Sequence, residues 1–177
     1  MELNTIKGTL LAAAAISVVA WTSAGTNNDD LAKLVSQPVG KIEMKTLEGT
    51  TLSNKDFKGK VVLIDFWATW CGPCVMASPV MQKLHTEFKD KGLLVIGANT
   101  FEEDGTGKLA REYKKEHKYT YAVTYNNDKL AEKWGIQGIP TFVIVGVDGK
   151  VAKTFVGFDE SLEKEMRTTI QKLLPKK

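Results

Sequence analysis

Residues 61–74 read VVLIDFWATWCGPC, and this stretch decides the fold. Its first seven residues are almost all apolar, which is typical of a central strand buried on both faces. A Cys-x-x-Cys pair, Cys71 and Cys74, follows, and the spacing after it predicts a helix beginning near Cys71. The apolar positions of that helix repeat at the interval of one helical face: Ala77, Val80, Met81, Leu84 and Phe88. Pro79 lies inside this helix and is expected to kink it.

The remaining patterns predict an ordered alternation of strands and helices. Hydrophobic runs and turn residues indicate a small hairpin at 42–52, strands at 93–98 and 122–124, helices at 108–118 and 128–134, a second hairpin at 141–156 and a final helix at 162–173. Asp148-Gly149 marks the turn of that second hairpin. This order predicts an α/β fold with a central mixed β-sheet flanked by helices, an N-terminal β-hairpin and an inserted helical segment.

The N-terminal segment differs in composition from the rest of the chain. Residues 1–24 contain a 12-residue apolar run at 10–21 and end in the small residues Thr22-Ser23-Ala24. We expect a cleaved signal peptide, with an uncleaved membrane anchor as the alternative; the run is short for a membrane span, which needs about 20 apolar residues. Residues 25–37 are polar and are predicted to be a linker, and residues 38–177 form the predicted domain.

Charge and cysteine content exclude several classes of function. The net charge is +3, from 24 Lys+Arg against 21 Asp+Glu, which is too small to indicate a nucleic-acid-binding protein. The two cysteines are too few for a disulfide scaffold. A zinc site would need two more ligands, and His85 and His117 do not have the required spacing. We therefore expect no metal, no cofactor and a monomeric protein.

The position of the cysteine pair predicts redox chemistry. Cys71 would face the unpaired backbone N–H groups and the positive end of the helix dipole, which both favour the thiolate. We expect Cys71 to be the nucleophile and Cys74, one turn deeper, to be the resolving thiol. Asp65 lies within the buried strand, where desolvation raises a carboxyl pKa, and such a group suits proton transfer to or from a buried thiol. An inert structural disulfide is the alternative for the pair, and a strand-edge position is the alternative for Asp65.

Several motifs resemble the thioredoxin superfamily. Residues 65–74, DFWATWCGPC, look like the active-site segment of thioredoxin, and residues 138–141, GIPT, look like its cis-proline loop. The Lys58-Gly59-Lys60 lead-in and the extra helix are closer to the TlpA/ResA-like subfamily of exported or membrane-tethered bacterial reductases. The resemblance covers about residues 38–173 and implies a thioredoxin fold.

The resemblance also implies how substrate is bound. It implies a cis peptide bond between Ile139 and Pro140, which would leave backbone free to pair with an extended substrate. Spacing alone would leave an ordinary trans proline open. The substrate-binding residues expected from the resemblance are Trp70, Gly72, Pro73, Ile139 and Pro140, whereas Trp67 is expected to be buried.

One departure bears on the biological role. TlpA/ResA-like proteins of cytochrome c maturation often carry glutamate three residues after the second cysteine, where this chain has Ala77. The Gly72-Pro73 dipeptide matches thioredoxin, whose potential is about −270 mV against about −120 mV for the oxidant DsbA, so a reductant is expected. Protein disulfides are the expected substrates, a membrane protein of the DsbD or CcdA type the expected electron donor, and the periplasm the expected location.

Two other functions are open from the sequence. A peroxiredoxin-like peroxidase would share the frame, but its Pro-x-x-x-Thr-x-x-Cys pattern is missing because Asp65 stands in the proline position. A binding or chaperone module with an inert disulfide is the third hypothesis. The stretch Glu102-Glu103-Asp104, followed by Gly105 and Gly107, is predicted to be a mobile acidic loop, with a calcium site as its alternative.

Overall fold

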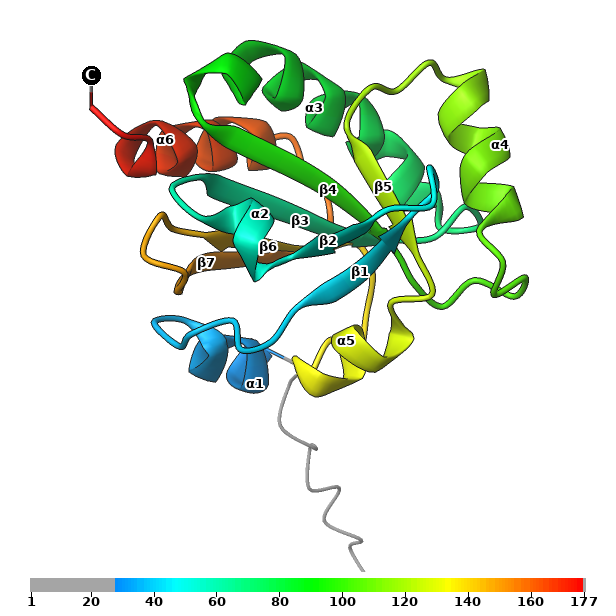
Figure 1. Cartoon of the computed structure of the whole chain (residues 1–177), viewed down its shortest axis with the longest axis horizontal. Helices are drawn as coiled ribbons and strands as arrows, with labels where there is room; N and C mark the ends of the chain where they lie inside the picture. Colours follow the sequence, from blue (N-terminus) through cyan, green and yellow to red (C-terminus); the bar gives the residue numbers. More distant parts are fainter. Residues whose placement is uncertain (1–27, 177) are drawn as a thin grey trace, which may run out of the picture.

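The computed structural model describes residues 28–176, and a seven-stranded sheet runs through their centre (Figure 1). The strands are β1 (Glu43–Thr46), β2 (Thr51–Ser53), β3 (Val61–Trp67), β4 (Leu93–Asn99), β5 (Ala122–Tyr125), β6 (Thr141–Val145) and β7 (Val151–Val156). The helices are α1 (Asn28–Leu34), α2 (Asn54–Phe57), α3 (Gly72–Phe88), η1 (Lys89–Lys91), α4 (Lys108–Glu116), α5 (Asp128–Lys133) and α6 (Leu162–Leu173). The predicted mixed α/β architecture is confirmed.

The strand order is β2-β1-β5-β4-β3-β6-β7, which puts β3 near the middle. Strands β3, β4 and β5 are parallel, whereas β6 and β7 are antiparallel to their neighbours. The N-terminal hairpin joins the far edge because β1 pairs with β5, with Lys45 opposite Tyr125. Because β3, β4 and β5 run parallel, their carboxyl ends lie at the same end of the sheet, and the cysteine motif follows β3 at that end.

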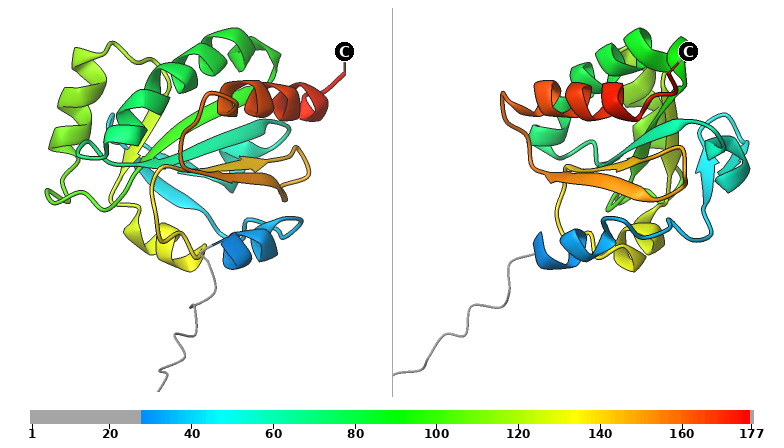
Figure 2. Two further views of the ribbon diagram at one scale, coloured as in Figure 1. Left: turned by 180° about the vertical axis from the view of Figure 1, so that it is seen from behind. Right: turned by 90° about the vertical axis from the view of Figure 1, so that its left-hand side faces the viewer.

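Helices cover both faces of the sheet, and Figure 2 shows the two layers from behind and from the side. Alternate residues of β3 serve the two faces, because strand side chains alternate in direction. Leu63 and Trp67 pack in a cluster with α3, α4 and α6, whereas Ile64 and Phe66 pack in a second cluster with α1 and α5. Every residue of β3 is buried, as its continuous apolar sequence predicts. Among residues 28–176, no helix is long and apolar enough to cross a membrane.

Helix α3 begins immediately after the strand that carries the site. Cys71 is its N-cap residue and Pro73 lies in its first turn, where a missing N–H costs nothing. Pro79 lies on the exposed side inside the helix, which continues past it to Phe88. The face predicted to be buried is buried at Ala77, Met81 and Leu84. The helix therefore packs on the sheet through this apolar face.

The predicted linker needs a correction at its C-terminal side. Residues 28–34 form helix α1, and Leu31 is 3% exposed within the second cluster. The next residues pair with β7, since Ser36 N–H donates to Val151 O at 2.7 Å and Val39 N–H donates to Gly149 O at 3.2 Å. The polar composition hid the apolar i, i+3 pair Leu31 and Leu34. The folded unit therefore starts before residue 38, while the predictions for residues 1–27 lie outside the described residues.

Candidate active site

The two cysteines are joined in a disulfide at the first turn of α3, with their Cα atoms 5.2 Å apart. They differ in access, because Cys71 is 5% exposed and Cys74 is 0% exposed. The backbone N–H of Cys74 is directed at the Cys71 sulfur, 3.3 Å away. An N–H group at a helix start stabilises negative charge on such a sulfur. The geometry thus gives Cys71 both the approach from solvent and the polar contact that a thiolate needs.

The loop before β6 lies against the same sulfur. The peptide bond between Ile139 and Pro140 is cis, as the resemblance implies. The carbonyl oxygen of Ile139 is 3.7 Å from Cys71 Sγ. The loop is anchored on both sides: Thr141 Oγ1 donates to Gly138 O at 2.7 Å, and Gly157 N–H donates to Pro140 O at 2.8 Å. Segments 68 residues apart in the chain are therefore held together at the disulfide.

Asp65 is buried, as its place in the strand predicts, with 1% of its surface exposed. It alternates with Leu63 and Trp67 and so lies on the face of β3 that carries the cluster containing Cys74. Neither of its carboxyl oxygens has a hydrogen-bond partner among the described residues. Desolvation raises the pKa of Asp65 well above its ordinary value. The site thus holds a carboxyl group that retains its proton more readily than an exposed aspartate.

Gly97 makes room beside Asp65. It pairs with Asp65 across β3 and β4, and a side chain at this position would meet Trp67 Nε1 at 3.0 Å and Tyr121 Cε2 at 3.1 Å. Both rings therefore fill the space next to the carboxyl group. Burial raises the pKa of Tyr121 well above its ordinary value, and the nearby charge of Asp65 is the second cause of this rise. Sequence patterns gave no reason to single out Tyr121, because its contact with this face depends on the β5 connection.

The other predicted substrate-binding residues surround Cys71 at the surface. Trp70 is 61% exposed, and its Nε1 donates to the carbonyl oxygen of Phe101 at 2.9 Å. Gly72 and Pro73 are also exposed, at the first two positions of α3. Trp67, in contrast, is buried, as expected. The structure therefore brings all five predicted substrate-binding residues close to the disulfide, with Trp70, Gly72 and Pro73 exposed and Pro140 buried.

The acidic stretch after β4 is part of the rim of this site, and its first residue is anchored there. The Glu102 carboxylate accepts hydrogen bonds from Thr69 N–H and Thr69 Oγ1, both at 2.9 Å, and from Asn99 Nδ2 at 2.8 Å. It ties the loop to the residues directly before Trp70 and Cys71. The 33-residue separation between Thr69 and Glu102 left no local signal for this contact.

Asp104 has a separate structural task. Its carboxylate accepts the backbone N–H groups of Thr106 and Gly107 at 3.0 and 3.1 Å and that of Leu109 at 2.8 Å, at the start of α4. These hydrogen bonds lower the pKa of Asp104. A group of three or more potential metal ligands does not occur in the part of the chain that the structure describes.

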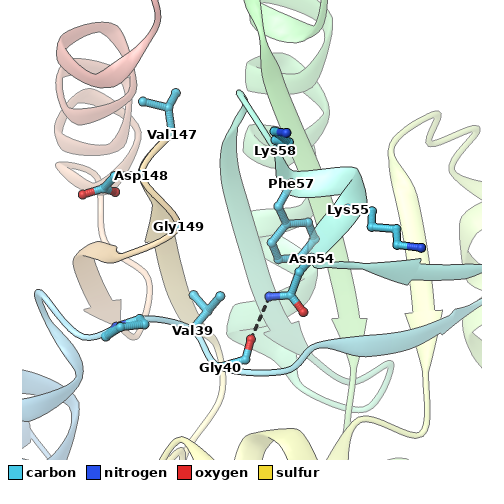
Figure 3. Close-up of a pocket in the computed structure, with 10 residues that line it drawn as sticks. Val39, Gly40, Asn54, Lys55, Phe57, Lys58, Val147, Asp148 and Gly149 are labelled. Atoms are coloured by element: carbon cyan, nitrogen blue, oxygen red, sulfur yellow. Dashed lines mark hydrogen bonds between the residues drawn. The ribbon is translucent and has the colours of Figure 1, made fainter.

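A hollow of about 500 Å³ lies near the start of β3. Figure 3 shows the residues that line it. The hollow is formed by the segment before β1, helix α2 and the turn between β6 and β7, and its apolar lining residues include Val39, Phe57 and Val147. Asn54 Nδ2 donates to Gly40 O at 2.7 Å on one wall. The hollow contains neither cysteine and lies near the start of β3, whereas the cysteines follow its end. It is separate from the redox site.

Comparison with known proteins agrees with this geometry, since residues 32–170 match the Redoxin family. The chain belongs to the Redoxin family. Among its relatives, the thiol-disulfide oxidoreductase ResA of Bacillus thuringiensis subsp. konkukian is 30% identical over 130 residues, 73% of this chain and 72% of the relative. The thioredoxin-like protein YneN of Bacillus subtilis is 31% identical over 131 residues, 74% of this chain and 76% of the relative.

One solved structure matches four-fifths of this chain over nearly the whole length of its own. It is a Chlorobium tepidum protein assigned as the thiol:disulfide interchange protein DsbE, with a TM-score of 0.72 and 25% identity over 80% of this chain and 98% of that one. The fold is therefore thioredoxin-like, and the TlpA/ResA-like resemblance is confirmed. With the cysteine pair in place, this Redoxin is a thioredoxin-like thiol–disulfide oxidoreductase.

Proposed function

We propose that this Redoxin is a reductase of protein disulfides, with Cys71 as nucleophile, Cys74 as resolving thiol and Asp65 as proton-transfer group. The main support for this proposal is that the two cysteines differ. Cys71 caps α3 and its sulfur accepts a hydrogen bond from the Cys74 N–H at 3.3 Å, whereas Cys74 itself is fully buried. A polypeptide substrate can reach only the first sulfur, and Trp70 and the Ile139–Pro140 loop flank that sulfur.

The reaction proceeds in two exchanges. The Cys71 thiolate attacks one sulfur of the substrate disulfide, a mixed disulfide forms, and the first substrate thiolate leaves and takes a proton from water. Cys74 then gives its proton to Asp65 and attacks the Cys71 sulfur. The second substrate thiolate leaves and takes that proton. The substrate gains two electrons and two protons, and the protein ends as the Cys71–Cys74 disulfide.

The residues between the cysteines support the proposed direction of the reaction. Gly72 and Pro73 place no charged side chain there that would strongly stabilise the Cys71 thiolate, so the dithiol is reducing. An exported reductase must be re-reduced in an oxidising compartment. We infer that a membrane electron donor of the DsbD or CcdA type supplies the electrons and that the protein acts as a monomer.

The proposed location is the periplasm, after export directed by residues 1–24. The apolar run at 10–21 and the small residues at 22–24 support this location. The haem-attachment cysteines of an apocytochrome c are one candidate substrate, supported by the likeness to ResA and DsbE. Ala77 counts against that substrate, because its buried side chain brings no carboxyl group beneath Cys74.

A trapping experiment tests the proposed function. Cys74→Ala leaves Cys71 free to attack but removes the resolving thiol, so mixed disulfides should accumulate on Cys71 and can be identified by mass spectrometry. Cys71→Ser is the matched control and should trap nothing and lose insulin-disulfide reduction. Adducts on Cys74 in the Cys71→Ser protein, with insulin reduction retained, would reverse the roles. Redox titration against glutathione tests direction, and a potential near about −120 mV would make the protein an oxidant.

A further inference from the structure

Phe101 forms a ridge between two hollows at the rim of the redox site. The first hollow, about 360 Å³, is lined by Thr69, Trp70, Phe101, Glu102, Glu103 and Leu109. The second, about 420 Å³, is lined by Phe101, Asp128, Glu132, Gly135, Ile136 and Gln137. We call these the Trp70 hollow and the Gln137 hollow. Phe101 contributes to both, so the two hollows adjoin.

The ridge is fixed by hydrogen bonds on both sides. Phe101 has a left-handed backbone with φ 55°, which turns the chain sharply after β4. Its carbonyl oxygen accepts Trp70 Nε1 at 2.9 Å, and its N–H donates to Asp128 Oδ1 at 2.8 Å. Phe101 remains 36% exposed. The backbone of Phe101 is thus anchored while its apolar side chain is exposed, which provides a pre-formed contact surface.

The two hollows lie beside the two segments that border the attacking sulfur. Trp70 directly precedes Cys71, and Gln137 stands two residues before Ile139, whose carbonyl oxygen is 3.7 Å from Cys71 Sγ. A polypeptide whose disulfide meets Cys71 therefore passes over this rim. Side chains near its cysteines come within reach of one hollow or the other.

The charge of the hollows is opposite to that of the whole chain. Each hollow is lined by two carboxylates and by no Lys or Arg, although the chain has a net charge of +3. Glu102 and Asp128 accept hydrogen bonds that hold the ridge, whereas Glu103 and Glu132 are exposed and form no ion pair within residues 28–176. The resulting surface is aromatic and acidic.

Among residues 28–176, the nearby cations form no ion pair with these carboxylates. Lys108 lies 4.0 Å from Glu112 on its own helix, and the Lys133 ammonium lies 3.3 Å from the position of a Cβ on Gly40. Lys129 is exposed on α5 and lines neither hollow. Two negative charges therefore stay available to a partner at the rim.

We propose that the preferred substrates are polypeptides carrying Lys or Arg within a few residues of the reacting disulfide. The aliphatic stem of such a side chain packs against Trp70 or Phe101, and its charged end lies at Glu103 or Glu132. A glutamate in the same place would meet like charge and be disfavoured. The inference rests on the proposed function, because it names the substrate class of the same site.

Three synthetic peptides test the proposal: each is closed by one disulfide, and its cysteines are flanked by Lys, by Glu or by Ser. The full-length protein is pre-reduced with dithiothreitol, freed of it, and mixed with each peptide under single-turnover conditions, so that no electron donor takes part. The Lys peptide is expected to react about two- to fivefold faster than the Ser peptide for each carboxylate engaged, and the Glu peptide more slowly than the Ser peptide. At about 1 M salt, where the Debye length is about 3 Å, the three rates should converge.

Variants assign the effect to the rim. Glu103→Gln combined with Glu132→Gln should bring the Lys-to-Glu rate ratio close to one. Glu116→Gln is the matched control, since Glu116 is equally exposed but lies at the far end of α4, and it should keep the wild-type ratio. An unchanged ratio in the double variant, or a wild-type preference for the Glu peptide, would overturn the proposal. Failure to reduce any of the three peptides, or insulin, would instead refute the proposed function.

Discussion

Replacing Asp65 with asparagine tests the buried carboxyl group most directly. The two side chains have nearly the same size and shape, so the substitution removes the titration without opening a cavity. Asp65 is 1% exposed, and both carboxyl oxygens lack partners among the described residues. Burying a charged carboxylate without partners costs several kilocalories per mole, and the group responds by keeping its proton. Asp65→Asn should therefore stabilise the protein at pH values at which an exposed aspartate would be ionised.

The sign and the size follow from linkage between protonation and folding. The pKa of Asp65 is raised in the folded protein, so the unfolded chain loses this proton at a lower pH than the folded one. Between an ordinary aspartate pKa of about 3.9 and the raised value, the unfolded state binds fewer protons, and stability falls as pH rises. The slope is about 1.4 kcal/mol per pH unit for one proton. Below about pH 4 the contribution of Asp65 to the unfolding free energy is fully retained, and above the folded-state pKa this contribution is lost.

Denaturant unfolding of the oxidised proteins at several pH values between 4 and 8 measures this slope. The difference in unfolding free energy between Asp65→Asn and wild type should grow with pH in favour of the variant. Ile64→Val is the matched control, because Ile64 is buried in the same strand and the change removes no ionisable group, so its difference from wild type should not vary with pH. If the Asp65→Asn and wild-type curves stay parallel from pH 4 to 8, the reasoning is refuted.

The same variant tests the proposed proton transfer. Without a carboxyl group on the face of β3 that carries the cluster containing Cys74, the attack by Cys74 on a mixed disulfide should slow near neutral pH, and its pH dependence should flatten. Stopped-flow reduction of a disulfide peptide separates this second exchange from the first. A resolution step with an unchanged pH profile would remove Asp65 from the mechanism, even if the stability result holds.

Three further predictions follow from the packing. Glu102→Ala should lower the unfolding free energy by about 1–3 kcal/mol and slow insulin reduction, because Thr69 loses two hydrogen bonds next to the site. Glu102→Gln should restore most of the stability and most of the activity. Equal losses in the two variants would contradict this prediction. Gly107→Ala should destabilise by at least about 1 kcal/mol, since φ is +74° and the new Cβ would lie 2.7 Å from Tyr125 Cγ; a melting temperature equal to wild type would exclude the clash. Leu84→Ala should cost about 2–5 kcal/mol in denaturant unfolding, whereas Val156→Ala, at an exposed position, should cost far less.

Much of the framework was predictable because its signals are local. The apolar run of β3, the periodic face of α3 and the turn at Asp148-Gly149 each depend on residues a few positions apart, and all three predictions agree with the structure. The burial of Asp65 was predictable for the same reason, since the neighbours in its own strand are apolar. The helix α1 was missed because one turn of apolar residues in a polar stretch is too weak a signal to outweigh composition.

The sequence by itself determined the chemistry of the site: a cysteine pair at a strand-to-helix junction, with an acidic residue inside the strand. Only the tertiary structure decided what surrounds that pair. The Ile139 carbonyl lies against Cys71, Glu102 hydrogen-bonds Thr69, and Tyr121 lies in the space beside Gly97. In each of these pairs the two residues are far apart in the sequence. Such contacts depend on the order of strands in the sheet, which puts β5, β4, β3 and β6 side by side. Local sequence patterns determine the secondary-structure propensity of each element. They do not determine which strands pair, and strand pairing brings loops from separate elements to one end of the sheet.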